Sequence, residues 1–340
     1  MDLSIIIPVY NVEKYIRSCL ESVFRQGLDD DCFEIIMVND GTCDNSFQTI
    51  EDIILLHSNI HIIEQPNLGL GVARNNGLIY ANGKYVLFVD SDDLLVDNSL
   101  QKILHFAVGS DADIVSADYL EIEDDCVPHC EINYEVSEML DMWEGTSFDF
   151  FLYKFDGRSF VWRNLYKRQF LNCQSIRFVP NICFEDILFN TECVLKSHKC
   201  LKISTPLYVY RQRYDSFVHQ IDKKKMKDLN YVISCLWEFE KNYRHLSKLD
   251  RRLKDFIFDT FSFYLWYMIS YNHLFKERRE IIRDLKDRVP NLFFNNNMKQ
   301  IIISFMFKII PCQYIFVRRG FDVLTKMIRI VTIIIVTQYG

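Results

Sequence analysis

No apolar run in the 340 residues approaches the roughly 20 residues that a membrane-spanning helix needs. The chain also has no internal repeat and no low-complexity linker. Its hydrophobic fraction of 49% and charged fraction of 25% are ordinary for a globular protein, which excludes a disordered chain. The length favours one large domain with a smaller one, either soluble or lying on a membrane without crossing it.

Eleven cysteines are an odd number, and no signal peptide precedes Ile5. Both features favour reduced thiols in a cytoplasmic protein over a disulfide framework. Cys126 and Cys130 flank His129, but no second close cysteine pair completes a structural zinc site. We therefore expect free thiols and no structural zinc.

The net charge of −7 conceals a division of the chain into two parts of opposite sign. Residues 222–340 carry 22 Lys and Arg against 12 Asp and Glu, a charge of +10, and residues 1–221 carry 17 against 34, a charge of −17. Such asymmetry indicates two roles, one of them contact with an anionic surface. A lysine-rich helical bundle with no such contact accounts for it equally well.

The first 120 residues alternate between strand and helix patterns. Short apolar runs bounded by polar or turn residues predict five buried strands, at Leu3–Ile7, Glu34–Val38, Ile60–Ile63, Tyr85–Val89 and Asp113–Ala117. Helical periodicity predicts helices after Asn11, which would act as the N-cap, over Phe47–Leu56 and from Leu70. This alternation favours an α/β protein with a Rossmann-like, mostly parallel sheet flanked by helices.

The remainder of the chain is less regular. Residues 120–160 are acidic and without a clear period, so we interpret them as an insertion over one face of the sheet. Short mixed segments fill residues 161–219. Beyond residue 221 the apolar residues recur at helical spacing, which predicts an all-helical domain over residues 222–340 after a first domain over residues 1–221.

Polar residues follow three of the predicted strands. Their sequences are Pro8-Val9-Tyr10-Asn11, Asn39-Asp40-Gly41-Thr42 and Asp90-Ser91-Asp92-Asp93. Ligands of open α/β sheets bind outside the carboxyl ends of the strands, so these segments should converge on one acidic site.

Asp90, Asp92 and Asp93 give the strongest indication of chemistry. Three carboxylates within four residues repel one another unless a cation or hydrogen-bond donors offset them. Hard oxygen ligands suit Mn²⁺ or Mg²⁺, which complete their shell with water and substrate phosphates. The alternative is a solvated acidic turn before a helix, and the position after a buried strand favours the metal site.

The other strand ends are compatible with a nucleotide ligand. Asp40 could accept a hydrogen bond from a base, with Tyr10 beside the ring, although a plain Asp-Gly turn and simple packing of Tyr10 are the alternatives. Gly69 to Arg74 lacks the last glycine of a dinucleotide fingerprint and follows the third strand instead of the first, so NAD binding is not expected. Arg74 could meet a phosphate or a base edge.

These motifs together resemble the family 2 glycosyltransferases of the GT-A fold, in order and in spacing. The resemblance extends to Phe184-Glu185-Asp186 and to Tyr210-Arg211-Gln212-Arg213-Tyr214-Asp215-Ser216, and so covers about residues 3–219. Thr42-Cys43-Asp44 departs slightly from the usual Ser-Thr-Asp but retains the aspartate. The family implies an inverting single displacement from a nucleotide-diphosphate sugar, most often a UDP-sugar, to a glycan or lipid-linked acceptor, as in surface polysaccharide synthesis, with no nucleic-acid partner.

The resemblance also implies a role for each site residue. Asp40 and Tyr10 would hold the nucleobase and Asp90 the ribose. Asp92 would bind the metal, and Asp186 would be the general base that takes the proton of the acceptor hydroxyl. The pyrophosphate would be clamped by Arg211, Arg213 and Ser216, and the donor-binding set is completed by Pro8, Arg74 and Ser91.

Purely structural explanations of these residues, and two other functions, are the alternatives to this assignment. Without the family, Glu185 and Asp186 are favourable charges at a helix N-terminus, and an Arg-rich loop is a solvated one. A sugar nucleotidyltransferase would need a glycine-rich loop after the first strand, where Pro8 to Asn11 stand. A non-catalytic scaffold of a polysaccharide assembly complex would need neither Asp92 nor Asp186.

Residues 301–340 predict contact with a membrane surface. They combine apolar runs with five basic residues against Asp322 alone, a pattern typical of interfacial helices, although a buried packing helix has the same composition. Each Lys or Arg near an anionic leaflet adds about 1 kcal/mol to binding. We expect the full chain to sediment with anionic liposomes at low salt and a chain without residues 301–340 to remain in the supernatant. Equal sedimentation of both forms would show that this segment only packs.

Overall fold

A computed structural model describes residues 1–124, 141–213, 222–270, 277–292 and 300. The chain divides into two compact units, Met1–Ser216 and Phe217–Gly340. The boundary predicted after residue 221 falls beside residues 214–221, outside the described residues, and stays a prediction. The Cys126, His129 and Cys130 group and residues 301–340 also lie outside them.

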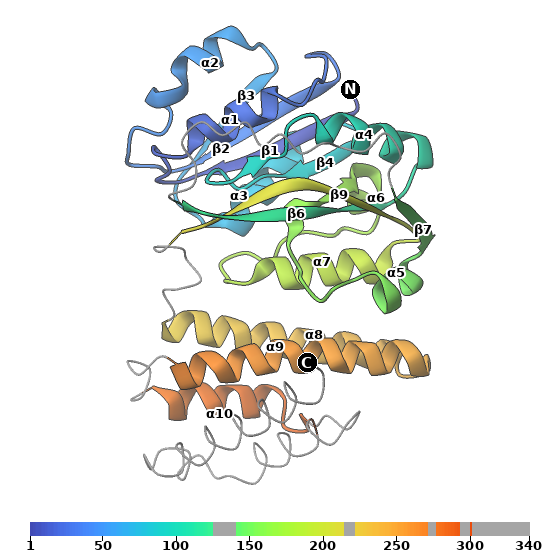
Figure 1. Ribbon diagram of the computed structural model, residues 1–340. Helices are drawn as coiled ribbons and strands as arrows, with labels where there is room; N and C mark the ends of the chain where they lie inside the picture. The colour runs from blue at the N-terminus through green and yellow to red at the C-terminus, as the bar shows by residue number, and fades with distance from the viewer. Residues whose placement is uncertain (125–140, 214–221, 271–276, 293–299, 301–340) are drawn as a thin grey trace. The chain divides into compact units, whose positions relative to one another are not determined.

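The first unit is built on a mixed nine-stranded sheet (Figure 1). The strands are β1 (Leu3–Val9), β2 (Phe33–Asp40), β3 (Ile60–Gln65), β4 (Tyr85–Phe88), β5 (Leu94–Leu95), β6 (Ile114–Glu123), β7 (Met142–Thr146), β8 (Asn164–Lys167) and β9 (Lys199–Gln212). Their order is β3-β2-β1-β4-β8-β6-β9-β5, with β7 paired to β9. Neighbours from β3 to β4 are parallel, whereas β8 runs antiparallel to both β4 and β6.

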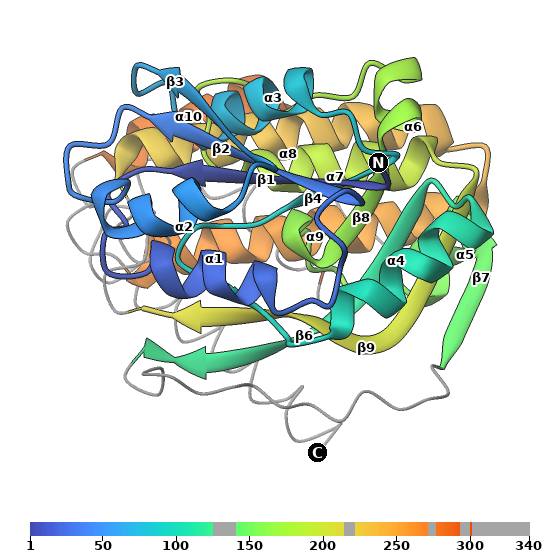
Figure 2. The same ribbon diagram turned by 90° about the horizontal axis from the view of Figure 1, so that it is seen from above.

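Helices cover both faces of the parallel strands. They are α1 (Ile16–Phe24), α2 (Glu51–Leu56), α3 (Leu70–Tyr80), α4 (Ser99–Ser110), α5 (Ser147–Tyr153), α6 (Arg168–Cys173) and α7 (Glu185–Lys196). Figure 2 shows α1 and α4 on one side of β1 and α3 on the other. Successive side chains of a strand point to opposite faces of the sheet. Ile5 and Ile7 therefore join the core with α1 and α4, and Ile6 faces α3.

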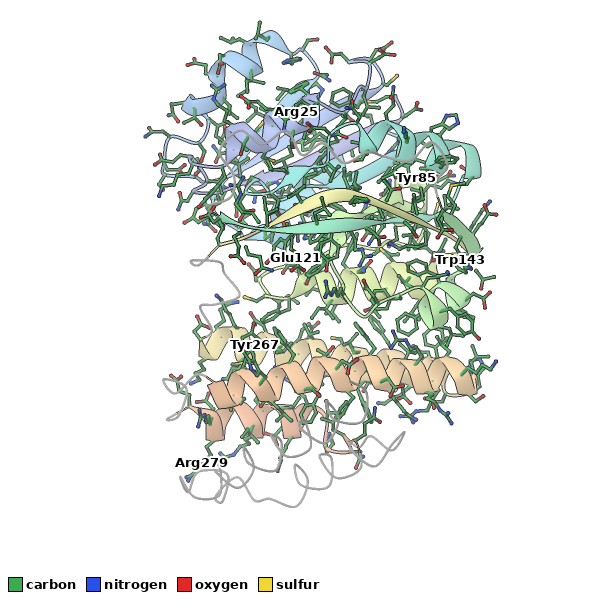
Figure 3. The ribbon with its side chains drawn as sticks, viewed as in Figure 1. Arg25, Tyr85, Glu121, Trp143, Tyr267 and Arg279 are labelled. Carbon is green, nitrogen blue, oxygen red and sulfur yellow. The ribbon has the colours of Figure 1, made fainter. Side chains whose placement is uncertain are left out.

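Burial explains why β1 is apolar except for Ser4, whose hydroxyl donates to Glu34 Oε1 at 2.6 Å. β1 lies between β2 and β4 with helices on both faces, so all seven of its residues are buried. The neighbouring β4 is anchored to the end of α4, because the Tyr85 hydroxyl lies 2.7 Å from the carbonyl oxygen of Ala107 and 2.8 Å from that of Ala112 (Figure 3). These contacts fix the amino end of β4 against the end of α4.

The five predicted strands are confirmed as β1, β2, β3, β4 and β6, and the sequence-based α/β class is confirmed with them. Two details differ. β6 continues to Glu123 because it pairs along its length with β9, and residues 141–153, assigned to an irregular insertion, form β7 and α5. Antiparallel pairing through β8, β7 and β5 makes the sheet mixed.

The helix cap predicted at Asn11 is wrong. α1 begins at Ile16, and Asn11 has a φ of 53° in the left-handed region that asparagine tolerates. Its amide N–H donates to Thr42 Oγ1 at 2.7 Å, and its Oδ1 accepts from the N–H of Cys43 at 3.1 Å. Asn11 therefore joins the loops that follow β1 and β2.

The second unit is helical throughout its described part. α8 (Lys223–Tyr243) packs against both α9 (Ser247–Ser270) and α10 (Arg278–Arg288). The predicted apolar stripe on α8 is buried, including Met226, Leu229 and Ile233. Within the portions of the chain that the structure describes, no helix combines the length and hydrophobicity that crossing a bilayer requires.

The contact between α3 and β1 predicts a stability difference between two glycine variants. A methyl group at Gly77 would overlap Ile6 Cγ2 and lie 3.3 Å from Ile6 Cγ1, whereas one at Gly109 in α4 would meet nothing within 4 Å. Both Gly→Ala changes gain helix propensity, but only Gly77→Ala overpacks the core. We expect it to be less stable than Gly109→Ala by about 1–3 kcal/mol in urea unfolding. Equal unfolding free energies would show that the core adapts to the extra methyl.

Candidate active site

Three strand ends form the edge of the candidate site. β1, β2 and β4 are parallel, so the residues after them lie at the same side of the sheet. Pro8 is buried within β1, while the Tyr10 side chain that follows is 45% exposed. Asp40 ends β2, and the loop Asp90–Asp93 follows β4 directly.

Asp90 is joined to a buried cation on α3. Its Oδ1 lies 2.6 Å from a guanidinium nitrogen of Arg74, and the other terminal nitrogen of Arg74 lies 2.8 Å from Glu185 Oε1. Arg74 is only 2% exposed and also lies over the Phe178 ring at 5.3 Å. Asp90 and Glu185 raise the pKa of Arg74 against the lowering effect of burial. Arg74 thus connects the end of β4 with the start of α7. Direct contact between Arg74 and the sugar donor stays a prediction.

Asp92 is joined to a different cation. Its Oδ2 lies 2.6 Å from a guanidinium nitrogen of Arg213, which stands just beyond the end of β9. Arg211 Nε donates to the main-chain oxygen of Asp92 at 2.9 Å. Burial raises the pKa of Asp92, and the charge of Arg213 opposes the increase.

Asp93 is bound by neutral donors. Its Oδ2 accepts from the Tyr208 hydroxyl at 2.9 Å and its Oδ1 from the Arg211 amide N–H at 2.8 Å. The Tyr208 hydroxyl in turn accepts from the Asp90 amide N–H at 3.0 Å. Burial raises the pKa of Asp93 well above its ordinary value. This third aspartate therefore fixes the loop against β9 from inside.

The start of α7 presents a second pair of acids. Phe184 precedes the helix with a φ of 64°, a strained conformation for an aromatic residue. Glu185 is paired with Arg74, and Asp186 Oδ1 accepts from the Ile187 N–H at 2.9 Å. Burial, followed by the charge of Glu185, raises the pKa of Asp186 to about 7. A carboxylate with such a pKa can accept a proton near neutral pH.

Asp40 is held by the loop after β3. Its Oδ1 accepts from Gln65 Nε2 at 2.6 Å and the Leu68 N–H at 2.8 Å, and its Oδ2 accepts from the Gly69 N–H at 3.0 Å. Gln65 Oε1 also accepts from Asn76 Nδ2 on α3. Asp40 thereby orders the polypeptide that leads into the helix of Arg74.

The structure brings most of the predicted site residues into one charged network. Arg74 links Asp90 to the helix of Asp186, and β9 supplies contacts to the loop through Arg211 and Arg213. Ser91 is buried in the same loop, and Ser216 lies outside the described residues. The assigned donor and catalytic roles stay predictions.

Three contributors were not assigned a site role from the sequence. Glu185 carries the second half of the Arg74 bridge, and its place beside Asp186 is the signal that could have indicated it. Tyr208 lies within the apolar strand β9, and Tyr15 lies beneath both arginines, with ring centroids 5.0 Å from Arg211 Cζ and 4.9 Å from Arg213 Cζ. No local pattern distinguishes either tyrosine from a packing residue.

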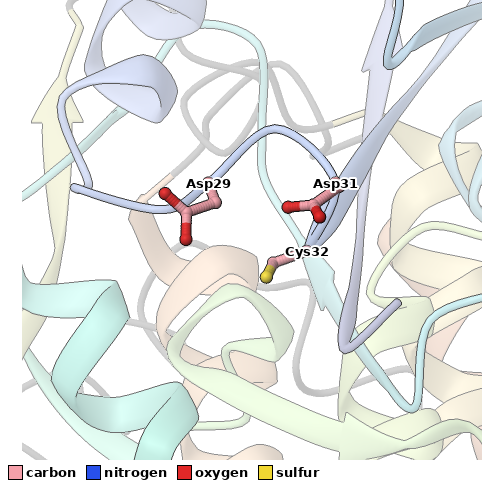
Figure 4. Close-up of side chains that lie close together, drawn as sticks. All are labelled: Asp29, Asp31 and Cys32. Carbon is pink, nitrogen blue, oxygen red and sulfur yellow. The ribbon is translucent and has the colours of Figure 1, made fainter.

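A divalent cation fits the chemistry of Asp92. Such ions use one or two carboxylates and complete their shell with water and phosphates, and Asp92 Oδ2 already accommodates a cation in the form of Arg213. The described residues also bring together Asp29, Asp31 and Cys32 (Figure 4). That group is largely exposed and precedes β2, at the opposite end of the strand from Asp40, so we assign no metal to it.

Comparison with known proteins agrees with this geometry. Residues 4–129 match the family model for glycosyl transferase family 2. The uncharacterised glycosyltransferase EpsJ of Bacillus subtilis is 34% identical over 224 residues, which are 63% of this chain and 62% of EpsJ. Residues 4–129 therefore belong to glycosyl transferase family 2.

Other relatives extend the comparison. The minor teichoic acid biosynthesis protein GgaA of B. subtilis is 26% identical over 313 residues, 88% of this chain and 66% of GgaA. This chain thus spans slightly less than two thirds of the length of EpsJ and of GgaA. The crystal structure of S. aureus TarS 1-349 superposes with a TM-score of 0.66 at 22% identity, over 85% of this chain and 81% of that one. The family's GT-A fold, including a helical C-terminal region, is therefore confirmed.

Proposed function

We propose that this family 2 protein is an inverting glycosyltransferase that transfers a sugar from a nucleotide-diphosphate donor to a hydroxyl of an acceptor glycan. The observation that carries the proposal is the network joining the Asp90–Asp93 loop, through Arg74, to the start of α7. The network joins Asp90 and Glu185, which stand two residues before Asp92 and one residue before Asp186. It therefore supports our assignment of the metal-binding carboxylate and the base to one site, at the carboxyl ends of the parallel strands. A scaffold would require neither carboxylate.

A UDP-sugar is the proposed donor. The TarS structure, which shares the fold, was also solved in complex with UDP-GlcNAc and with UDP. In this chain Tyr10 offers an exposed ring and Asp40 a carboxylate at the adjacent strand end. Asp90, Arg74, Pro8 and Ser91 would complete the donor site.

Asp92 would hold Mn²⁺ or Mg²⁺, which supplies neutralisation of the charge on the departing diphosphate when it is bound. Arg211 and Arg213 would add positive charge beside the diphosphate, from β9 and the residue after it. Asp186 would take the proton of the attacking hydroxyl. Burial raises its pKa, which makes the carboxylate a stronger base.

The acceptor is proposed to be a surface polysaccharide or its lipid-linked precursor, at the cytoplasmic face of a membrane. Support comes from the teichoic acid role in the name of GgaA. The basic second unit would then act beside the acceptor and the membrane. Residues 301–340, which would contact the lipid, lie outside the described residues.

The first test is donor cleavage by the purified chain. We expect release of nucleotide diphosphate from one member of a panel of nucleotide sugars with Mn²⁺, loss of release with excess chelator, and recovery when Mn²⁺ or Mg²⁺ is restored. Asp92→Asn should abolish the activity because a hard ligand is lost. Asp29→Asn, in the exposed acidic group before β2, is the matched control and should retain it. Full activity in excess chelator would refute the metal assignment.

The second test separates the base from donor binding. Asp186→Asn retains the shape of the side chain but cannot accept the proton, so kcat should fall by about 10²–10⁴-fold. Donor affinity measured by calorimetry should hardly change. Glu192→Gln, farther along α7, removes a carboxylate from a surface pair with Lys196 and should leave kcat unaltered. Lost donor binding in Asp186→Asn would place Asp186 in the donor site.

The pH profile gives the same test without a mutation at Asp186. The base works only when deprotonated, and its pKa is raised to about 7, so the rate should increase with pH through a midpoint near 7. Burial and the charges of Glu185 and Asp90 raise the pKa of Asp186, and the charge of Arg74 lowers it. NMR of the product should show an anomeric configuration inverted relative to the donor, and retention would exclude the single displacement.

A further inference from the structure

Asp92 is paired with a guanidinium at the position assigned to a metal. Arg213 lies 2.6 Å from Asp92 Oδ2, and the two side chains are 17% and 23% exposed. The pair is therefore screened from water more than a surface ion pair is, so its electrostatic attraction is strong. Any cation that binds Asp92 must compete with the Arg213 guanidinium.

Arg211 and Arg213 differ in how firmly the fold holds them. Arg211 belongs to β9, opposite Ile122 of β6, and its amide N–H and Nε donate to Asp93 and to the main chain of Asp92. Arg213 lies one residue beyond the last residue of the strand ladder, Gln212. The fold thus fixes the backbone of Arg211 within the sheet, whereas the backbone of Arg213 lies just outside the ladder.

Tyr15 offers Arg213 a second contact besides Asp92. Its ring lies under Arg213 as well as Arg211, and its hydroxyl donates to Asp124 at 3.2 Å, which fixes the ring. A guanidinium is attracted to an aromatic face, and Arg213 also forms a side-chain hydrogen bond with Tyr15, so the tyrosine would continue to stabilise Arg213 after it leaves Asp92.

Charge balance indicates where Arg213 would go. A divalent cation and a guanidinium cannot both occupy the same carboxylate oxygen without strong repulsion. A nucleotide diphosphate brings negative oxygens that pair well with a guanidinium. Metal and diphosphate arriving together therefore satisfy Asp92 and Arg213 at once, whereas metal alone leaves Arg213 beside a second cation.

We propose that Arg213 is the internal counter-ion of Asp92 in the donor-free protein and is exchanged onto the diphosphate when metal and nucleotide bind. The inference rests on the proposed function. Its consequence is that free Mn²⁺ binds weakly and that Mn²⁺ and UDP each increase the affinity for the other. The protein would thereby avoid holding a metal ion at Asp92 in the absence of donor.

The test measures Mn²⁺ binding to the full chain by electron paramagnetic resonance, with and without UDP. In Arg213→Gln the competing charge is absent, so Mn²⁺ alone should bind about tenfold more tightly, the lower end of what one nearby charge does to an ionisable site. The increase in Mn²⁺ affinity that UDP causes should shrink in the same variant. Arg17→Gln, which removes an arginine paired with Asp52 on the surface, is the matched control and should behave like wild type.

A double variant locates the effect. If Arg213 acts through Asp92, then Arg213→Gln should change Mn²⁺ affinity much less in an Asp92→Asn background than in wild type. Unchanged Mn²⁺ affinity in Arg213→Gln, with normal Mn²⁺–UDP binding by wild type, would overturn the exchange and leave the proposed function intact. Failure of wild type to bind Mn²⁺ even with UDP would overturn both.

Discussion

Three aspartates within four residues, one buried and two mostly enclosed, can lie together only if each has its own compensating partner. Asp90 has Arg74, Asp92 has Arg213, and Asp93 has the Tyr208 hydroxyl and a main-chain N–H. An unpaired buried carboxylate would be strongly destabilising, so these contacts hold the loop after β4 in one conformation. The positions of α3, α7 and β9 around the loop follow from this requirement.

The partners give each aspartate a different character. Asp93 is buried and accepts hydrogen bonds from neutral donors. Burial raises its pKa, and its contacts stabilise the loop. Asp90 is held by an arginine that is itself shared with Glu185, so the loop after β4 and the start of α7 cannot move independently. Asp92 has the partner nearest to the end of a strand, which makes it the carboxylate best placed to exchange one cation for another.

Much of the first unit could be predicted because its signals are local. A buried parallel strand is a short apolar run, and the polar residues after it show where the site must lie, as at Asp40 and Asp90. The failures come from contacts between residues that are distant in the sequence. Asn11 has the composition of a helix cap but joins two loops, and the pairing of β6 with β9 to Glu123 depends on a strand that is distant in the sequence.

The sequence by itself determined the parallel strands, the acidic loop after β4 and, through its motifs, the glycosyltransferase family. Only the tertiary structure decided which cation faces which carboxylate, because Asp93 and Arg211 are separated by 118 positions and Arg74 and Glu185 by 111. Burial of Asp186, and hence its raised pKa, is also a tertiary property. Residue types and spacing define which charges are present, whereas their pairing and desolvation arise only when the sheet and α7 enclose them.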